Sequence, residues 1–224
     1  MGAGSGALVL TSAQGNGTVT INATQFTGLT TITSVSAGAV AVNLAGGAKG
    51  AFSAGIVSTT ASFTLTQTAA ASGSTTITGI SASGAISIAL GSGNGSGDVA
   101  ISTTTTDSTF SLTGSQYSDV TLDTINAASG ITINMAGSGS IAASSLHTAG
   151  TFTFAKAIGS GETAVITDMS ATSISITLGA GSSTFSSQTI NAGDFSFDST
   201  ASTEESLQHT LDVITAQGAV SISL

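Results

Sequence analysis

Short segments in which apolar and polar residues alternate recur along the whole chain. Alternation over five or six residues predicts β-strands with one buried face and one exposed face. Glycine-rich stretches follow these segments and would supply the backbone conformations that tight corners require. The clearest segments are Val40–Leu44, Ile86–Leu90, Ile131–Met135 and Ile174–Leu178.

The alternating segments belong to an internal repeat. Their closing residues Leu44, Leu90, Met135, Leu178 and Leu224 are separated by 46, 45, 43 and 46 positions. We interpret residues 1–224 as one repetitive domain that five copies fill. The copies lie at approximately 1–45, 46–90, 91–136, 137–179 and 180–224.

A second set of alternating runs halves the period to about 22 residues. A unit of this length with two short strands cannot bury its apolar face alone, whereas stacked units form a continuous core. The sequence therefore predicts an all-β fold, a parallel β-solenoid (β-helix) of about ten coils, roughly 48 Å long at a strand spacing of about 4.8 Å. The second set comprises Val19–Ile21, Phe63–Leu65, Phe110–Leu112, Phe152–Phe154 and Phe195–Phe197.

Four phenylalanines head runs of the second set, at positions 63, 110, 152 and 195. In a solenoid they would form a ladder inside the core on alternate coils, about 9.6 Å apart. A five-bladed propeller is an alternative, because blades of this length contain four strands, but the half-period argues against it. An antiparallel sandwich would show more Asn-Gly turns and no fixed period.

Composition narrows the classes of partner. The chain has 38 Ser, 38 Thr and 29 Gly, only 6% charged residues and a net charge of −9, with Lys49 and Lys156 as its only fixed cations. A nucleic-acid binder must neutralise several phosphates with Lys or Arg, so nucleic acid is excluded as a partner. No segment reaches the apolar length of a transmembrane helix, so we expect no membrane insertion.

The sequence leaves the export route open. The absence of cysteine fits an extracellular bacterial product but also a cytosolic protein. Residues 1–6 lack the basic start and apolar run of a signal peptide. Either export uses a signal outside this segment, or the chain is part of a longer one.

We expect no enzymatic activity. No Gly-x-Ser-x-Gly elbow and no nucleotide-binding glycine motif occurs. His147 and His209 are 62 positions apart and share no motif, so we expect solvent-facing or corner roles for them. We expect water-exposed corner positions also for the acidic residues Asp119, Asp123, Asp168 and Asp212.

One segment has the composition of a calcium-binding turn. Residues 93–98 read Gly-Asn-Gly-Ser-Gly-Asp, which resembles the Gly-Gly-x-Gly-x-Asp turn of calcium-binding nonapeptide repeats. Calcium takes six to eight oxygen ligands, which carboxylates and backbone carbonyls of solenoid turns can provide. Asp98 is therefore a candidate ligand for Ca²⁺, and no other cofactor is indicated.

The repeat itself resembles a known class of proteins. The runs 29–46, 74–91 and 119–137 are similar to the Ala/Thr/Ser/Gly-rich repeats of RTX-type bacterial surface-layer proteins and large secreted adhesins. This resemblance implies a β-solenoid, absence of cysteine, type I export without a cleaved N-terminal signal, and calcium-dependent assembly on the cell surface. The full nonapeptide repeats of that class are absent here.

These observations favour an extracellular structural protein of a bacterial cell surface that assembles with itself into a surface layer or filament. The last strand stops in full alternation with no visible cap, so Val220, Ile222 and Leu224 are candidate assembly residues at a terminal edge. The alternative is a stalk or binding module of a secreted adhesin. Such a module would contact a cell-surface glycan or ice through the small hydroxyl residues on the outward side of the strands.

Overall fold

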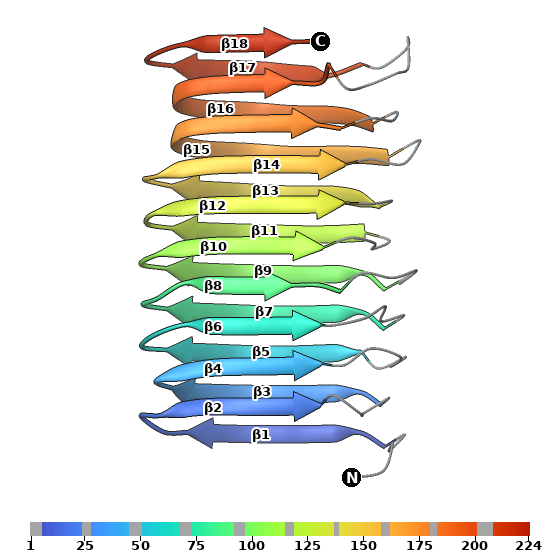
Figure 1. The fold of residues 1–224 in the computed structure, drawn as a ribbon, viewed down its shortest axis with the longest axis vertical. Helices are drawn as coiled ribbons and strands as arrows, with labels where there is room; N and C mark the ends of the chain where they lie inside the picture. The colour runs from blue at the N-terminus through green and yellow to red at the C-terminus, as the bar shows by residue number, and fades with distance from the viewer. Residues whose placement is uncertain are drawn as a thin grey trace.

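The protein is a stack of coils along one long axis, and the short β-strands of each coil run across that axis (Figure 1). A computed structural model describes residues 6–23, 28–44, 51–67, 73–91, 97–114, 119–136, 139–157, 162–179, 183–200 and 208–224. Eighteen strands lie in these residues, and every pairing between them is parallel; the described residues contain no helix. This arrangement is the predicted parallel β-solenoid, which is confirmed.

The strands form two walls on either side of the core, which we call the bent face and the flat face. The bent face contains β1 (Leu8–Gln14), β3 (Thr30–Ala37), β5 (Phe52–Thr59), β7 (Thr75–Ala82), β9 (Val99–Thr106), β11 (Asp119–Ala127), β13 (Ser140–Thr148) and β17 (Thr210–Ala216). The flat face contains β2 (Thr18–Ala23), β4 (Ala39–Leu44), β6 (Phe63–Gln67), β8 (Ile86–Ala89), β10 (Thr109–Gly114), β12 (Gly130–Ala136), β14 (Thr151–Ala157) and β18 (Val220–Ser223). The long strands β15 (Glu162–Leu178) and β16 (Ser183–Asp198) turn the corner and contribute to both faces.

Each strand pairs with its equivalent in the coils before and after it. Thr30 pairs with Leu8 and with Phe52, so one coil takes 22 residues there. Other coils take from 21 residues, as between Val99 and Val120, to 25, as between Phe195 and Val220. The predicted period near 22 residues is thus confirmed. The two alternating runs of the 45-residue repeat lie on the same face in successive coils, because β4 pairs with β6 and β6 with β8.

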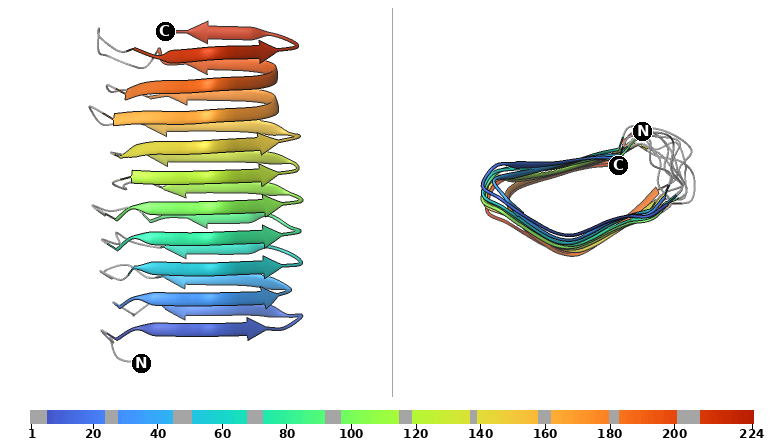
Figure 2. Two further views of the ribbon diagram at one scale, coloured as in Figure 1. Left: turned by 180° about the vertical axis from the view of Figure 1, so that it is seen from behind. Right: turned by 90° about the horizontal axis from the view of Figure 1, so that it is seen from below.

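The bent face owes its shape to one residue per coil that stays outside the strand register. Leu122 pairs with Ala143 and Thr124 with Ser145, but Asp123 and Ser144 between them do not pair. The same step occurs in every coil of this face, for example at Thr33 and Gly55. Seen along the axis, one wall runs straight and the other bends in its middle (Figure 2). The sequence analysis did not predict this bend.

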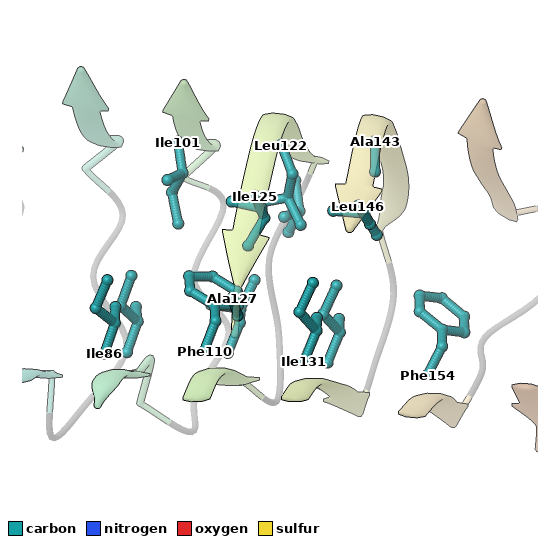
Figure 3. Packing of buried hydrophobic residues seen from close by; sticks show 14 of the residues in the cluster. Ile86, Ile101, Phe110, Leu122, Ile125, Ala127, Ile131, Ala143, Leu146 and Phe154 are labelled. Carbon is teal, nitrogen blue, oxygen red and sulfur yellow. The ribbon is translucent and has the colours of Figure 1, made fainter. Parts of the chain in front are cut away.

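A continuous core fills the space between the two faces. Ile86, Phe110 and Ile131 point from the flat face toward residues of the bent face, among them Leu122 and Leu146 (Figure 3). All five side chains are no more than 1% exposed. Burial of such aliphatic and aromatic side chains stabilises a fold by about 1.5–3 kcal/mol each, so this core provides the main stabilisation of the stack.

The phenylalanine ladder has the predicted spacing. Phe63, Phe110, Phe152 and Phe195 are 0–1% exposed. Each pairs with smaller aliphatic residues in the adjacent coils; Phe110, for instance, lies between Ile86 and Ile131. The phenylalanines therefore occupy alternate coils, as expected. The whole column reads Val19, Val40, Phe63, Ile86, Phe110, Ile131, Phe152, Ile174, Phe195 and Val220.

A second column, at the corner between the faces, alternates with the same two-coil period from Ala37 to Thr148, whereas Ala171, Ala192 and Ala216 pair with one another in the last three coils. Thr59, Thr106 and Thr148 stand in the coils that carry a ladder phenylalanine, and alanines 37, 82 and 127 in the coils between them. The Thr59 hydroxyl donates a hydrogen bond of 2.6 Å to the Gly38 carbonyl one coil below and accepts one of 3.2 Å from the Ala61 N–H. Thr106 repeats this with the Gly84 carbonyl and the Ser108 N–H. These hydroxyls satisfy buried backbone groups at the corner.

One of the two lysines is inside the solenoid. Lys156 of β14 is 2% exposed and pairs in register with Met135 and Leu178, two buried apolar residues. Its ammonium Nζ lies 2.9 Å from Glu162 Oε2 at the start of β15. A buried charge that loses its partner is costly, whereas replacing both charges can be nearly neutral.

We expect Lys156→Met to lower the free energy of unfolding by about 3 kcal/mol, because it leaves the Glu162 carboxylate largely buried without its cation. The double variant Lys156→Met/Glu162→Gln should recover most of this loss. Urea unfolding followed by circular dichroism measures both. If the double variant is no more stable than the single one, the ion pair is not the cause.

Coils pack so closely at some corners that only glycine fits. A Cβ at Gly150 would lie 1.7 Å from the Ser129 carbonyl oxygen of the preceding coil, whereas a Cβ at Gly79 would meet no heavy atom within 4 Å.

Gly150→Ala should therefore force two coils apart and lower the unfolding free energy by about 2 kcal/mol or more. Gly79→Ala is the matched control and should leave the urea midpoint nearly unchanged. Equal midpoints for the two variants would contradict this account.

Candidate functional site

The two end coils differ from all others because each pairs on one side only. Among the described residues β1 pairs with β3 and β2 with β4 at one end, and β17 and β18 pair with β16 at the other. The outer edges of these four strands present backbone N–H and C=O groups that can pair with another strand. The ends are visible at the bottom and top of Figure 1.

The coil at the C-terminal end exposes residues that continue the core columns. Val220 pairs with Phe195 and Ile222 with Phe197, two buried phenylalanines. Val220 and Ile222 are nevertheless 52% and 48% exposed, and Leu224 is 80% exposed. All three predicted assembly residues therefore lie on the open end, where an added coil would bury them. At the other end Val19 and Ile21 pack against the core and are only partly buried.

An aromatic cluster ends in a histidine at the same open end. The ring centroids of Phe185 and Phe197 lie 5.6 Å apart, and the His209 ring lies edge-on to Phe197 at 5.1 Å. The Phe185 N–H donates a hydrogen bond of 3.2 Å to His209 Nδ1, so that nitrogen carries no proton. Partial burial lowers the pKa of His209 below its ordinary value, because desolvation disfavours the charged ring. His209 thus takes part in the packing of this end coil, a role that the sequence analysis did not predict.

The outward side of the flat face is a surface of small hydroxyl residues. The middle outward position of successive strands forms one column along the axis, which we call the hydroxyl column. Its members are Thr20, Ala41, Thr64, Ser87, Ser111, Thr132, Thr153, Ser175, Ser196 and Ser221. Beside it, the Asn43 side-chain amide donates a hydrogen bond of 2.7 Å to the Asn22 side-chain carbonyl of the coil below. Only Ala41 interrupts the row of hydroxyls.

The candidate calcium ligand lies at the surface. Asp98 is exposed directly before β9, and its backbone carbonyl accepts a hydrogen bond of 2.8 Å from the Thr75 N–H. Residues 93–96 of the predicted turn lie outside the described residues. Within the described part of the chain, no group of three or more His, Cys, Asp or Glu side chains could hold a metal ion. Calcium binding by Asp98 stays a prediction.

His147 and Asp168, which were predicted to have separate surface roles, contact each other in the structure. His147 Nε2 of β13 lies 3.0 Å from Asp168 Oδ2 of β15, and both side chains are somewhat over a third exposed. Asp168 lies beside the bend of its face, Asp123 and Asp212 are the unpaired residues of the bend in their coils, and Asp119 opens β11. His147 and Asp168 are 21 positions apart, which is one coil. This spacing is the feature of the sequence that could have predicted their contact, because residues one period apart are stacked neighbours in a solenoid.

Comparisons with protein-family models, with curated proteins and with solved structures found no match. The described residues contain no helix long and apolar enough to span a membrane. The function is therefore inferred from the geometry of this chain, together with the resemblance of its repeats. The features available for that inference are the open end coils, the hydroxyl column and the polar pairs on the surface.

The lowered pKa of His209 predicts a stability that depends on pH. The unfolded chain binds a proton at the ordinary pKa near 6.5, above that of the folded state. The stabilisation from neutral His209 is thus complete above about pH 6.5 and is lost as the pH falls below it. The urea midpoint of the native sequence should fall between pH 7.5 and 5.5.

His209→Asn is the matched variant, because its side-chain oxygen can accept the Phe185 N–H but does not titrate. Its midpoint should fall less over the same range than that of the native sequence. Carboxylates contribute equally to both proteins, so the difference isolates His209. Identical pH dependence in the two proteins would contradict the assignment.

Proposed function

We propose that this protein is a non-enzymatic structural component of a bacterial cell surface that assembles with itself end to end into filaments or a surface layer. The observation that carries the proposal is the exposure of Val220 and Ile222, which are in line with the buried residues Phe195 and Phe197. A second copy, or further coils of a longer chain, would cover this edge together with the exposed Leu224. Extracellular location is part of the proposal and draws on the resemblance of the repeats to surface-layer proteins and adhesins.

The geometry of the two ends supports stacking of copies. A coil placed on β18 in the same parallel register would set Val19 of one copy beside Val220 of the next. It would likewise set Ile21 beside Ile222. Both contacts join aliphatic residues and extend each face by one strand, so the edge N–H and C=O groups gain partners. Stacking would thus continue the interactions that hold the coils together within one chain.

The polarity and the charge of the rod's sides favour association of copies through the ends over association through the flat face. That face is lined mainly by small hydroxyl and amide side chains, which water solvates well. A net charge of −9 also opposes close lateral packing of bare rods. In the proposal, calcium bound at exposed carboxylates such as Asp98 reduces this repulsion and allows ordered sheets.

Negative-stain electron microscopy of the purified chain, with millimolar calcium and with chelator, tests the proposal. We expect filaments or sheets whose subunit repeat follows the axis of the rod. Val220→Lys/Ile222→Lys should abolish them, because two charges would be buried at each junction. Val213→Lys, in the same coil but at the outward bend and 53% exposed, is the matched control and should assemble normally.

Single rods for the native sequence under both conditions would refute self-assembly. Loss of order in chelator alone would assign the acidic residues a role in calcium binding. Assembly that survives Val220→Lys/Ile222→Lys would show that the contacts lie elsewhere on the rod.

The second candidate function is a stalk or binding module that contacts ice or a glycan through the hydroxyl column. The observation that favours it is the alignment of hydroxyl side chains at the strand spacing over nearly every coil of the flat face. Thr64→Tyr/Thr153→Tyr would disrupt the flat surface without touching the ends. A loss of ice-recrystallisation inhibition or glycan binding with intact assembly would support this candidate.

A further inference from the structure

A shallow polar groove follows the corner where the bent face turns toward the flat face. Two adjoining hollows form it, of about 470 Å³ and 280 Å³, and they share Thr148, Ala149 and Ser170 as lining residues. The groove extends along the axis from the coil of β9 to the coil of β17. It lies apart from the end-coil residues Val220, Ile222 and Leu224 and from the hydroxyl column.

The shape of the groove follows from two columns of side chains. The outward residue before the corner is Asn126, His147 and Ser170 in successive coils, followed by Asn191. The residues just past the corner include Ala128, Ala149 and Gly193, which are small and leave space beside the polar column, and Thr172, which also lines the hollow. A larger residue at Ala128 or Ala149 would fill part of the hollow, whereas a Cβ at Gly193 would meet the Thr172 carbonyl oxygen of the preceding coil.

The chemistry of the lining is polar and free of formal charge, apart from the titratable His147. Hydroxyls of Thr and Ser and side-chain amides of Asn191, Asn126 and Gln217 line the two hollows. His147 is oriented by Asp168, whose carboxylate lies 3.0 Å from Nε2. This carboxylate can accept a hydrogen bond from Nε2–H, and in the neutral ring Nδ1 is then an acceptor. The groove therefore offers both donors and acceptors along its length.

We propose that this groove binds a linear, uncharged oligosaccharide segment along the axis of the rod. Five coil steps separate β9 from β17, or about 24 Å at the strand spacing, which is room for several sugar rings. The polar lining matches the hydroxyls of a sugar, and no Lys or Arg lines the hollows to favour an anionic polymer. A protein partner would require large apolar or aromatic anchors, whereas the apolar residues of the lining are all alanines.

Saturation-transfer NMR with the full chain tests the inference, with maltohexaose, cellohexaose and chitohexaose as probes and glutamate hexapeptide as a charged comparison. We expect transfer to at least one hexasaccharide and none to the peptide. Ala149→Leu should weaken that binding at least tenfold by filling the groove. His147→Ala and Asn191→Ala should each weaken it severalfold.

The matched control is Ala142→Leu, at an exposed alanine of the same coil that does not line the groove. It should bind like the native sequence, and circular dichroism verifies the fold of each variant. Absence of transfer to all three hexasaccharides at millimolar concentration would overturn the inference, as would binding that Ala149→Leu leaves unchanged. Electron microscopy of Ala149→Leu should still show assembly, so the outcome is independent of the proposed end-to-end function.

Discussion

Parallel pairing of each strand with its equivalent one coil away is the constraint on which the whole structure depends. It favours side chains of the same kind at the same position of successive coils, because each side chain packs against both neighbours; exceptions such as Lys156 between Met135 and Leu178 need a partner of their own. The inward columns of the two faces satisfy this with aliphatic and phenyl groups, and the outward columns with small polar ones. The narrow range of coil lengths in the paired strands follows from the same requirement. Length differences fall in the connections between faces, where no register has to be kept.

The architecture could be predicted from the sequence because parallel pairing of coils imposes a regular repeat of apolar positions, and the sequence shows that repeat. Alternation within Phe110–Leu112 and Ile131–Met135 set the inward and outward sides, and the 21-residue step between them set the coil. The ladder of phenylalanines followed from the same two facts. The fold was thus accessible from hydrophobic spacing alone.

Other features were not accessible, for identifiable physical reasons. The bend at Asp123 depends on one unpaired residue inside a run that still looks strand-like. The burial of Lys156 depends on Glu162, which lies six positions along the chain but one coil onward. The groove along the corner depends on small residues at Ala149 and Gly193 beside a polar column, and composition does not distinguish that from an ordinary turn. The surfaces that we propose to be functional are formed by residues of several stacked coils, so no motif within the sequence of one coil identifies them.

The alternation at the flat-face ladder and at the threonine corner has a consequence for how such a rod can change length. From Val40 to Val220 every phenylalanine has a smaller aliphatic residue on either side. Duplication of a single coil that carries a ladder phenylalanine would set two phenyl rings against each other at the strand spacing and over-fill that layer. Two smaller residues can be neighbours, as Val19 and Val40 are in the first two coils. Duplication of two coils restores the sequence of large and small layers. We therefore expect the pair of coils, about 45 residues, to be the unit by which such a rod can be lengthened or shortened without disturbing this ladder.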